Sequence, residues 1–164
     1  MKRRNFSLIL AGFIGVVCLG SGALAQASDD RLALKGYDPV AYFTEKRPML
    51  GDAQHQHEWD GATYRFASAK HLAMFKSDPD RYLPQYRNFC AASVARGEKV
   101  HGNPEWWLVS DGRLYLFGKP MGPGMMTADT AATIKRTADE NWSKVSKLAT
   151  PPLPNYMLRA GQPK

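Results

Sequence analysis

The chain of 164 residues is basic, with 22 lysines and arginines against 15 aspartates and glutamates and a formal net charge of +7. The first 27 residues contribute three of these positive charges and no acidic residue, which leaves +4 for the rest. The remaining cations are scattered along the chain rather than clustered as a nucleic-acid groove requires, so the composition argues against a nucleic-acid partner.

The N-terminus has the pattern of a secretory signal peptide. A basic start at residues 2–4 precedes an apolar run over residues 6–19 and then small residues. The run is shorter than the roughly 20 residues that span a bilayer, so we expect no stable membrane anchor. Two A-x-A patterns predict cleavage after Ala25 or Ala27 and a periplasmic or secreted protein. The pair Arg3-Arg4 leaves open whether the general or the twin-arginine route is used.

We therefore predict a leader over residues 1–27, one domain over 32–149 and a proline-rich tail over 150–164. About 137 residues would remain after cleavage, which is enough for one domain with a sizeable core and too few for two. Cys18 is lost with the leader, so the exported chain keeps Cys90 as its single cysteine and forms no internal disulfide. No internal repeat is visible in the sequence.

The first predicted elements are a helical turn and a hairpin. Asp38 as N-cap and Pro39 at the first helical position predict a short helix over 40–44. Two strands, 55–59 and 63–66, flank the turn dipeptide Asp60-Gly61. In the second strand the alternation places Tyr64 and Phe66 on one face.

Three short helices are predicted next. Ser68 caps a helix that ends at Asp78-Pro79, and a second short helix carries Tyr82. A third is predicted over 88–96, closed by Gly97, with Cys90 in its first turn.

A second hairpin and a longer helix complete the domain. Strands over 106–109 and 114–117 flank Asp111-Gly112, with Trp106 and Trp107 on opposite faces, one for the core and one for a groove. The last helix is predicted from Thr127 or Asp129 to about residue 148. Hairpins interleaved with short helices indicate a small single α+β domain with helices packed on an antiparallel sheet.

Several of these motifs, in order, resemble the YHS domain, and more narrowly the exported YHS-domain proteins and selenoproteins. They are residues 36–43 (GYDPVAYF), 59–68 (WDGATYRFAS), Asp78-Pro79 with Tyr82, 84–86 with Phe89-Cys90, the hairpin 107–116 and 139–142. The resemblance covers residues 34–148 and implies a compact α+β fold. YHS modules resemble small metal-binding domains attached to copper-handling proteins, and the position matching Cys90 is sometimes selenocysteine. The chain departs from the branch at Arg87-Asn88, where glycines are usual.

Cys90 is the candidate reactive residue. A helix N-terminus and the neighbouring Arg87 both favour the thiolate form, and the resemblance implies that sulfur or selenium chemistry matters at this position. The alternative is a buried side chain that acts as a small apolar group.

The candidate metal ligands are thiol, imidazole and thioether groups, a set that suits reduced copper or another soft transition metal. They are Cys90, His55, His57, His71, His101, Met121, Met125 and Met126. From these we predict a site made of Cys90, His71, His57 and Met125. His57 shares a strand face with His55, His71 resembles the family's histidine, and Met125 lies in a predicted flexible Gly-Pro loop. The alternatives are a solvent-facing strand edge, a histidine satisfied by its neighbours, and methionines that pack on the domain.

Three functions remain open. The first is a periplasmic metal-binding accessory, most plausibly for copper, anchored by Cys90. The second is a thiol redox protein in which Cys90 is the nucleophile and forms its disulfide with a small thiol or a partner. The third is a protein-binding module in which Cys90 is structural. The sequence has no Ser/His/Asp arrangement, phosphate-binding glycine loop or carboxylate pair typical of an enzyme.

Overall fold

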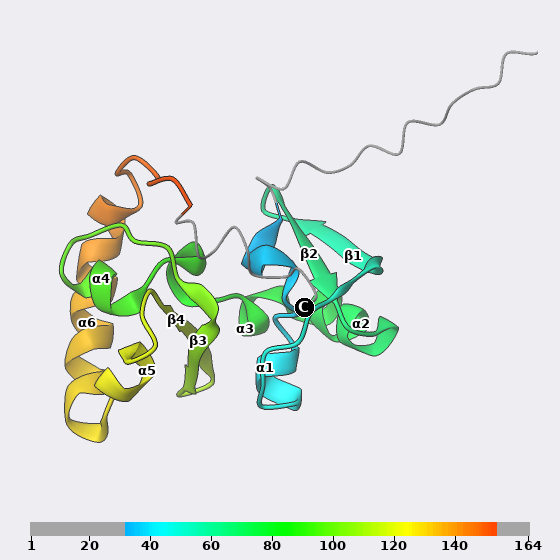
Figure 1. Cartoon of the computed structure of the whole chain (residues 1–164), viewed down its shortest axis with the longest axis horizontal. Coiled ribbons are helices and arrows are strands. Elements are labelled where there is room, and N and C mark those ends of the chain that lie inside the picture. The colour runs from blue at the N-terminus through cyan, green and yellow to red at the C-terminus, as the bar shows by residue number, and fades with distance from the viewer. Residues whose placement is uncertain (1–31, 154–164) are drawn as a thin grey trace, which may run out of the picture.

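The computed structural model describes residues 32–153 (Figure 1). The predicted leader over 1–27 and most of the predicted tail, 154–164, lie outside the described residues. Within the described range the protein is a small α+β domain whose longest helix is the last one, as the sequence predicts. The strands form two separate two-stranded antiparallel sheets and not the one sheet that we expected.

The elements alternate short helices with hairpins. In chain order they are the 3₁₀ turn η2 (Ala33–Gly36), α1 (Ala41–Thr44), β1 (Asp52–Trp59), β2 (Ala62–Phe66), α2 (Ala69–Ser77), α3 (Pro79–Tyr82), the 3₁₀ turn η3 (Gln85–Asn88), α4 (Ala91–Ala95), β3 (Asn103–Ser110), β4 (Arg113–Phe117), α5 (Gly122–Met125) and α6 (Ala128–Val145). Both predicted hairpins are confirmed, as are the caps Ser68, which accepts a hydrogen bond from His71 N, and Thr127, which forms a capping box with Thr130.

The structure contains one unit twice, which the sequence analysis missed. The first repeat (residues 33–77) and the second repeat (residues 85–125) each run from a 3₁₀ turn through a short helix and a hairpin to a second helix. In both, an eight-residue strand pairs with a five-residue strand through an Asp-Gly turn. The repeats share little sequence outside their hairpins, where DGATYRF (60–66) and DGRLYLF (111–117) have the same Asp, Gly, Tyr and Phe.

The two hairpins have the same register shift and the same hydrogen bond at their bulges. In β1–β2 the register shifts between Asp52 and Gln56, and in β3–β4 it shifts at the same place, between Asn103 and Trp107. The backbone N–H two residues into each bulge is held by a side chain: Gln54 N donates to Asp52 Oδ1 (2.8 Å), and Glu105 N donates to Asn103 Oδ1 (2.9 Å).

Further hydrogen bonds align Asp38 with Cys90, with one extra residue in the second repeat between this position and its hairpin. Asp38 N donates to Met49 O at 2.8 Å, and Cys90 N donates to Val100 O at 2.8 Å. Next to these bonds, Gly51 N donates to Gly36 O and Gly102 N donates to Asn88 O, both at 2.7 Å. A matched network of this kind means that Cys90 occupies in the second repeat the place that Asp38 has in the first.

Strand β4 joins the repeats into one domain. Leu114 and Leu116 belong to the apolar cluster of the first repeat, while Tyr115 and Phe117 belong to that of the second. Because neighbouring side chains of a strand point to opposite faces, β4 separates the two apolar clusters and contributes side chains to both. Figure 1 shows the β3–β4 hairpin between α4 and α6 on one side and α1, β1 and β2 on the other. Trp107 and Trp106 pack on the first and second clusters respectively, so each is partly buried.

Two predicted boundaries near Cys90 are wrong. The helix expected over 88–96 begins only at Ala91, because Tyr86, Arg87 and Asn88 have φ of 57°, 48° and 70°. Such a left-handed run is normally reserved for glycine, the residue that the YHS pattern has here. The side chain of Arg87 points away from Cys90, because its Nη2 donates to Asp60 Oδ2 of the first hairpin at 2.8 Å.

The loop expected over 121–126 instead contains the helix α5.

The last helix and the start of the tail differ less from their predicted bounds than the segments near Cys90 do. Helix α6 ends at Val145, and Leu148 is exposed beyond it, whereas Ala138 and Val145 are buried on the second cluster. Lys99 Nζ donates to Ser146 O and Leu148 O, so it satisfies carbonyls at the helix end. The start of the tail is tied down, because Pro151 O accepts a hydrogen bond from His101 Nε2 at 2.7 Å.

Candidate functional site

A cavity of about 410 Å³ opens beside Cys90 in the second repeat. Its size falls within the range of small-molecule sites and far exceeds the volume of a bare ion. The lining comes from α4, the segment 98–100, the end of β4 and α5, namely Cys90, Ala92, Ser93, Arg96, Glu98, Val100, Phe117, Gly118, Lys119, Met121, Gly122 and Met125.

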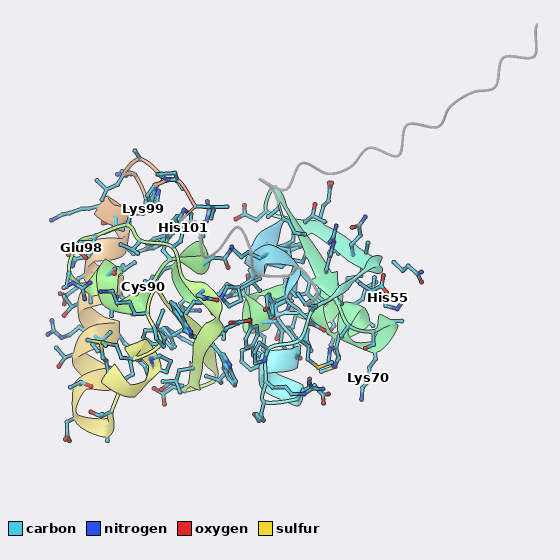
Figure 2. All side chains as sticks on the ribbon, viewed as in Figure 1. His55, Lys70, Cys90, Glu98, Lys99 and His101 are labelled. Carbon is cyan, nitrogen blue, oxygen red and sulfur yellow. The ribbon has the colours of Figure 1, made fainter. Side chains whose placement is uncertain are left out.

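Cys90 is held rigidly at the inner side of this cavity. It is the residue before α4, and its carbonyl accepts hydrogen bonds from Ser93 N and Val94 N. Together with the bond from its own N–H to Val100 O, these contacts fix its backbone on both sides. Only 6% of the residue is exposed, and Cys90 is among the residues that line the cavity. Figure 2 shows Cys90 within the second repeat, with Glu98 at the outer side of the same region.

Thioethers line the opposite side of the cavity. Met121 precedes α5 and Met125 ends it, and their exposed fractions are 68% and 45%. Met126, the third methionine of this segment, is buried in the second cluster instead. A thiol and two unbranched, adaptable and largely exposed thioethers therefore line one cavity, a set of donors that suits a soft metal ion.

Charged groups also line the cavity. The guanidinium of Arg96 donates to Ala92 O (3.0 Å), Ser93 Oγ (3.1 Å) and Glu98 Oε2 (3.0 Å), which fixes its orientation. Lys119 is a second, exposed cation, and Glu98 is the one acid of the lining. The lining thus carries a net charge of +1.

In the first repeat the corresponding place is filled. Asp38, the counterpart of Cys90, is 0% exposed, and its carboxylate accepts hydrogen bonds from Val40 N and Ala67 N, both at 2.8 Å. Its Oδ2 also lies 2.6 Å from His71 Nδ1. His71 comes from α2, and its other ring nitrogen, Nε2, lies 3.2 Å from Thr44 Oγ1 and 3.7 Å from Glu45 Oε1. Both nitrogens of this buried histidine therefore have partners.

The second repeat lacks this imidazole. Gly122 follows Phe117 by the same number of residues as His71 follows Phe66, and α5 contains no histidine. The neighbours of His71 correspond to residues that line the cavity: Asp38 to Cys90, Glu45 to Arg96 at the C-caps of the two short helices, and Ser68 to Lys119. The cavity is thus the opened counterpart of the Asp38–His71 pair.

The predicted ligand set is only partly brought together. Cys90 and Met125 line one cavity, whereas His71 is engaged with Asp38 in the first repeat. His57 pairs with Tyr64 across the first hairpin, and its ring centroid lies 6.4 Å from that of Phe75. His55 lies at the far side of the first repeat from Cys90 (Figure 2). Residues 32–153 contain no cluster of three or more histidine, cysteine or acidic groups arranged for a metal ion.

Sequence reasoning named Met121 among several candidates but had no way to select it, and it missed Arg96 and Lys119 as neighbours of Cys90. These residues are brought together by α4, α5 and the turn before α5, and the sequence analysis expected a loop where α5 lies. Alignment of the two hairpins through their Asp-Gly turns was the signal that would have revealed the repeat. It places Asp38 opposite Phe89, so the match of Asp38 with Cys90 also needs one extra residue before the second hairpin.

No protein-family model, curated protein or solved structure matches the chain. Among residues 32–153, no helix has the length and apolar character needed to cross a membrane.

Proposed function

We propose that the protein is an exported, YHS-type metal-binding accessory that holds a soft metal ion, Cu(I), at the Cys90 cavity. The observation that carries this proposal is that Cys90, Met121 and Met125 line one cavity. Cys90 anchors the ion as thiolate, and the two thioethers complete a shell of three sulfur donors. Thiolate and thioether ligands select Cu(I) over harder divalent ions.

The packing of the methionines supports binding rather than a core role. Side chains that served only the core would be covered, as Met126 is, yet Met121 and Met125 remain largely exposed beside the cavity. Flexible thioethers in this position can close on an ion that enters from solvent. The signal-like N-terminus and the YHS-like motifs agree with a role in metal handling in the periplasm.

Competition titration of the purified domain with a chromogenic Cu(I) chelator tests the proposal. We expect one Cu(I) per chain in the wild type. Loss of a supporting group outside the metal shell usually weakens metal affinity by about tenfold or more, so Cys90→Ser, which removes a ligand, should weaken it at least as much.

The methionines provide matched controls. Met121→Leu and Met125→Leu conserve volume and should each weaken Cu(I) binding, whereas Met74→Leu, in α2 of the first repeat, should leave it unchanged. Binding that survives Cys90→Ser, or that is lost equally in Met74→Leu, would contradict the proposed site.

A further inference from the structure

The volume and charge of the cavity are not explained by a metal ion alone. A three-sulfur shell needs no cationic groups, and a single ion fills a small part of about 410 Å³. In the first repeat the equivalent space holds the imidazole of His71, so the second repeat has room for a foreign group of at least that size.

The polar lining indicates the charge of that group. Where Glu45 and Ser68 approach His71 in the first repeat, the second repeat has Arg96 and Lys119. Arg96 shares its charge with Glu98, while Lys119 has no acidic partner among the contacts of residues 32–153. Two cations near a thiol favour a ligand that carries carboxylates.

The position of the thiol indicates the chemistry. Cys90 lines the cavity and only 6% of the residue is exposed, so a compound that reacts with its sulfur has to fit into a confined space. A ligand with both carboxylate and sulfur would meet the cations and Cys90 at once.

We propose that the cavity is a binding site for small acidic thiol compounds, and that Cys90 exchanges disulfide bonds with them. The Cys90 thiol releases its proton to solvent, and the thiolate attacks one sulfur of a small acidic disulfide. A bond forms between Cys90 Sγ and that sulfur, the original S–S bond breaks, and the other half leaves as a thiolate that takes up a proton. The sulfur of Cys90 is oxidised and that of the leaving half is reduced, so the electrons balance.

The test measures mixed-disulfide formation on the metal-free full chain, by mass spectrometry, at low ionic strength and in the presence of a metal chelator. Three probes differ in charge: oxidised glutathione is acidic, hydroxyethyl disulfide is neutral and cystamine is cationic. After division by the rates of the denatured protein, we expect the acidic probe to react about threefold to tenfold faster than the cationic one, since clefts of one charge sign raise association rates of opposite charges. High salt should reduce this preference.

Charge variants of the lining identify the site. Lys119→Glu should abolish or invert the preference, and Glu98→Gln should strengthen it. Lys70→Glu makes the same charge change on α2, far from Cys90 in Figure 2, and should leave the rates unchanged. Equal normalised rates for all three probes, or equal effects of Lys119→Glu and Lys70→Glu, would overturn the proposal.

The result is separable from the metal proposal. The exchange is measured without copper and in the presence of a chelator, so Cu(I) binding and the charge preference are measured separately. A protein that binds Cu(I) but shows no charge preference would retain the proposed function and lose this inference, and the opposite result would do the reverse.

Discussion

Asp38 and Cys90, which occupy corresponding positions in the two repeats, differ in how many hydrogen bonds their side chains accept. Asp38 is fully buried and accepts two backbone N–H groups in addition to its contact with His71. A thiol is a weak hydrogen-bond acceptor, so the Cys90 side chain links fewer of its neighbours by hydrogen bonds than Asp38 does. The first repeat is therefore closed by a polar pair, and the second is open beside a sulfur atom.

The closed pair should be important for stability. Asp38→Ala removes a buried carboxylate, leaves two backbone donors without an acceptor and deprives His71 of its partner. We expect a loss of about 3 kcal/mol in the free energy of unfolding, measured with urea. Asp80→Ala, at an exposed position of α3, should change it by less than about 0.5 kcal/mol. Equal effects of both changes would show that the Asp38 network contributes nothing.

At the scale of elements, α5 decides whether the cavity exists. A Cβ on Gly122 would lie 2.3 Å from Phe117 Cβ, so this helix packs against the end of β4 only because residue 122 has no side chain. A Cβ on Gly124 of the same helix would meet nothing within 4 Å.

These two glycines form a matched pair. Gly122→Ala should destabilise the domain by about 1–3 kcal/mol, because overpacking forces the helix away from Phe117, and it should also weaken Cu(I) binding. Gly124→Ala should be neutral or should stabilise by up to about 1 kcal/mol. Urea unfolding and Cu(I) competition check both variants, and a neutral Gly122→Ala would contradict the packing described for α5.

The sequence predicted elements well where local chemistry determines them. The Asp-Gly turns and the caps Ser68 and Thr127 act through their immediate neighbours, and each produced a correct element. The errors fall where tertiary contacts override local preference. Asn88 has a left-handed φ because Gly102 N bonds to its carbonyl, and α5 forms in a Gly-Pro segment because it covers Phe117.

The candidate site was predictable only in part for the same reason. Cys90 could be identified from the sequence, because it is the single cysteine after the predicted leader. Its neighbours could not, since Met121 and Arg96 reach it through the packing of α5 and α4 around the end of β4. His71 was proposed as a metal ligand from its residue type, and the geometry gives both of its ring nitrogens other partners.

At the scale of the whole molecule, strand β4 contributes to two apolar clusters, and both are rich in buried tyrosine. Burial raises the pKa of Tyr37 and of Tyr64 from 10.0 to about 12, with the hydrogen bond to Glu105 adding to the effect at Tyr37. Burial raises the pKa of Tyr42 and Tyr86 as well, and at Tyr86 the hydrogen bond to Asp139 adds to it. The folded domain therefore keeps these phenols neutral where the unfolded chain ionises them.

These shifts fix the sign of a pH dependence. Between pH 10 and about 12 the unfolded chain binds fewer protons than the folded domain, so the free energy of unfolding should fall as pH rises, whereas these groups have no effect below about pH 9. Urea unfolding at a series of pH values measures the fall. Tyr64→Phe removes one of these phenols and should make the fall less steep, and a stability that rises above pH 10 would contradict the burial described here.

We propose that the sulfur atoms of Cys90, Met121 and Met125, and not the histidines of the first repeat, hold the metal ion. X-ray absorption spectroscopy of the Cu(I)-loaded protein tests it most directly, because it distinguishes sulfur from nitrogen ligands. We expect sulfur ligands around the Cu(I) ion, with a ligand set that changes in Cys90→Ser and is unaffected by Met74→Leu. A shell dominated by imidazole nitrogen, or one that is identical in Cys90→Ser, would contradict it.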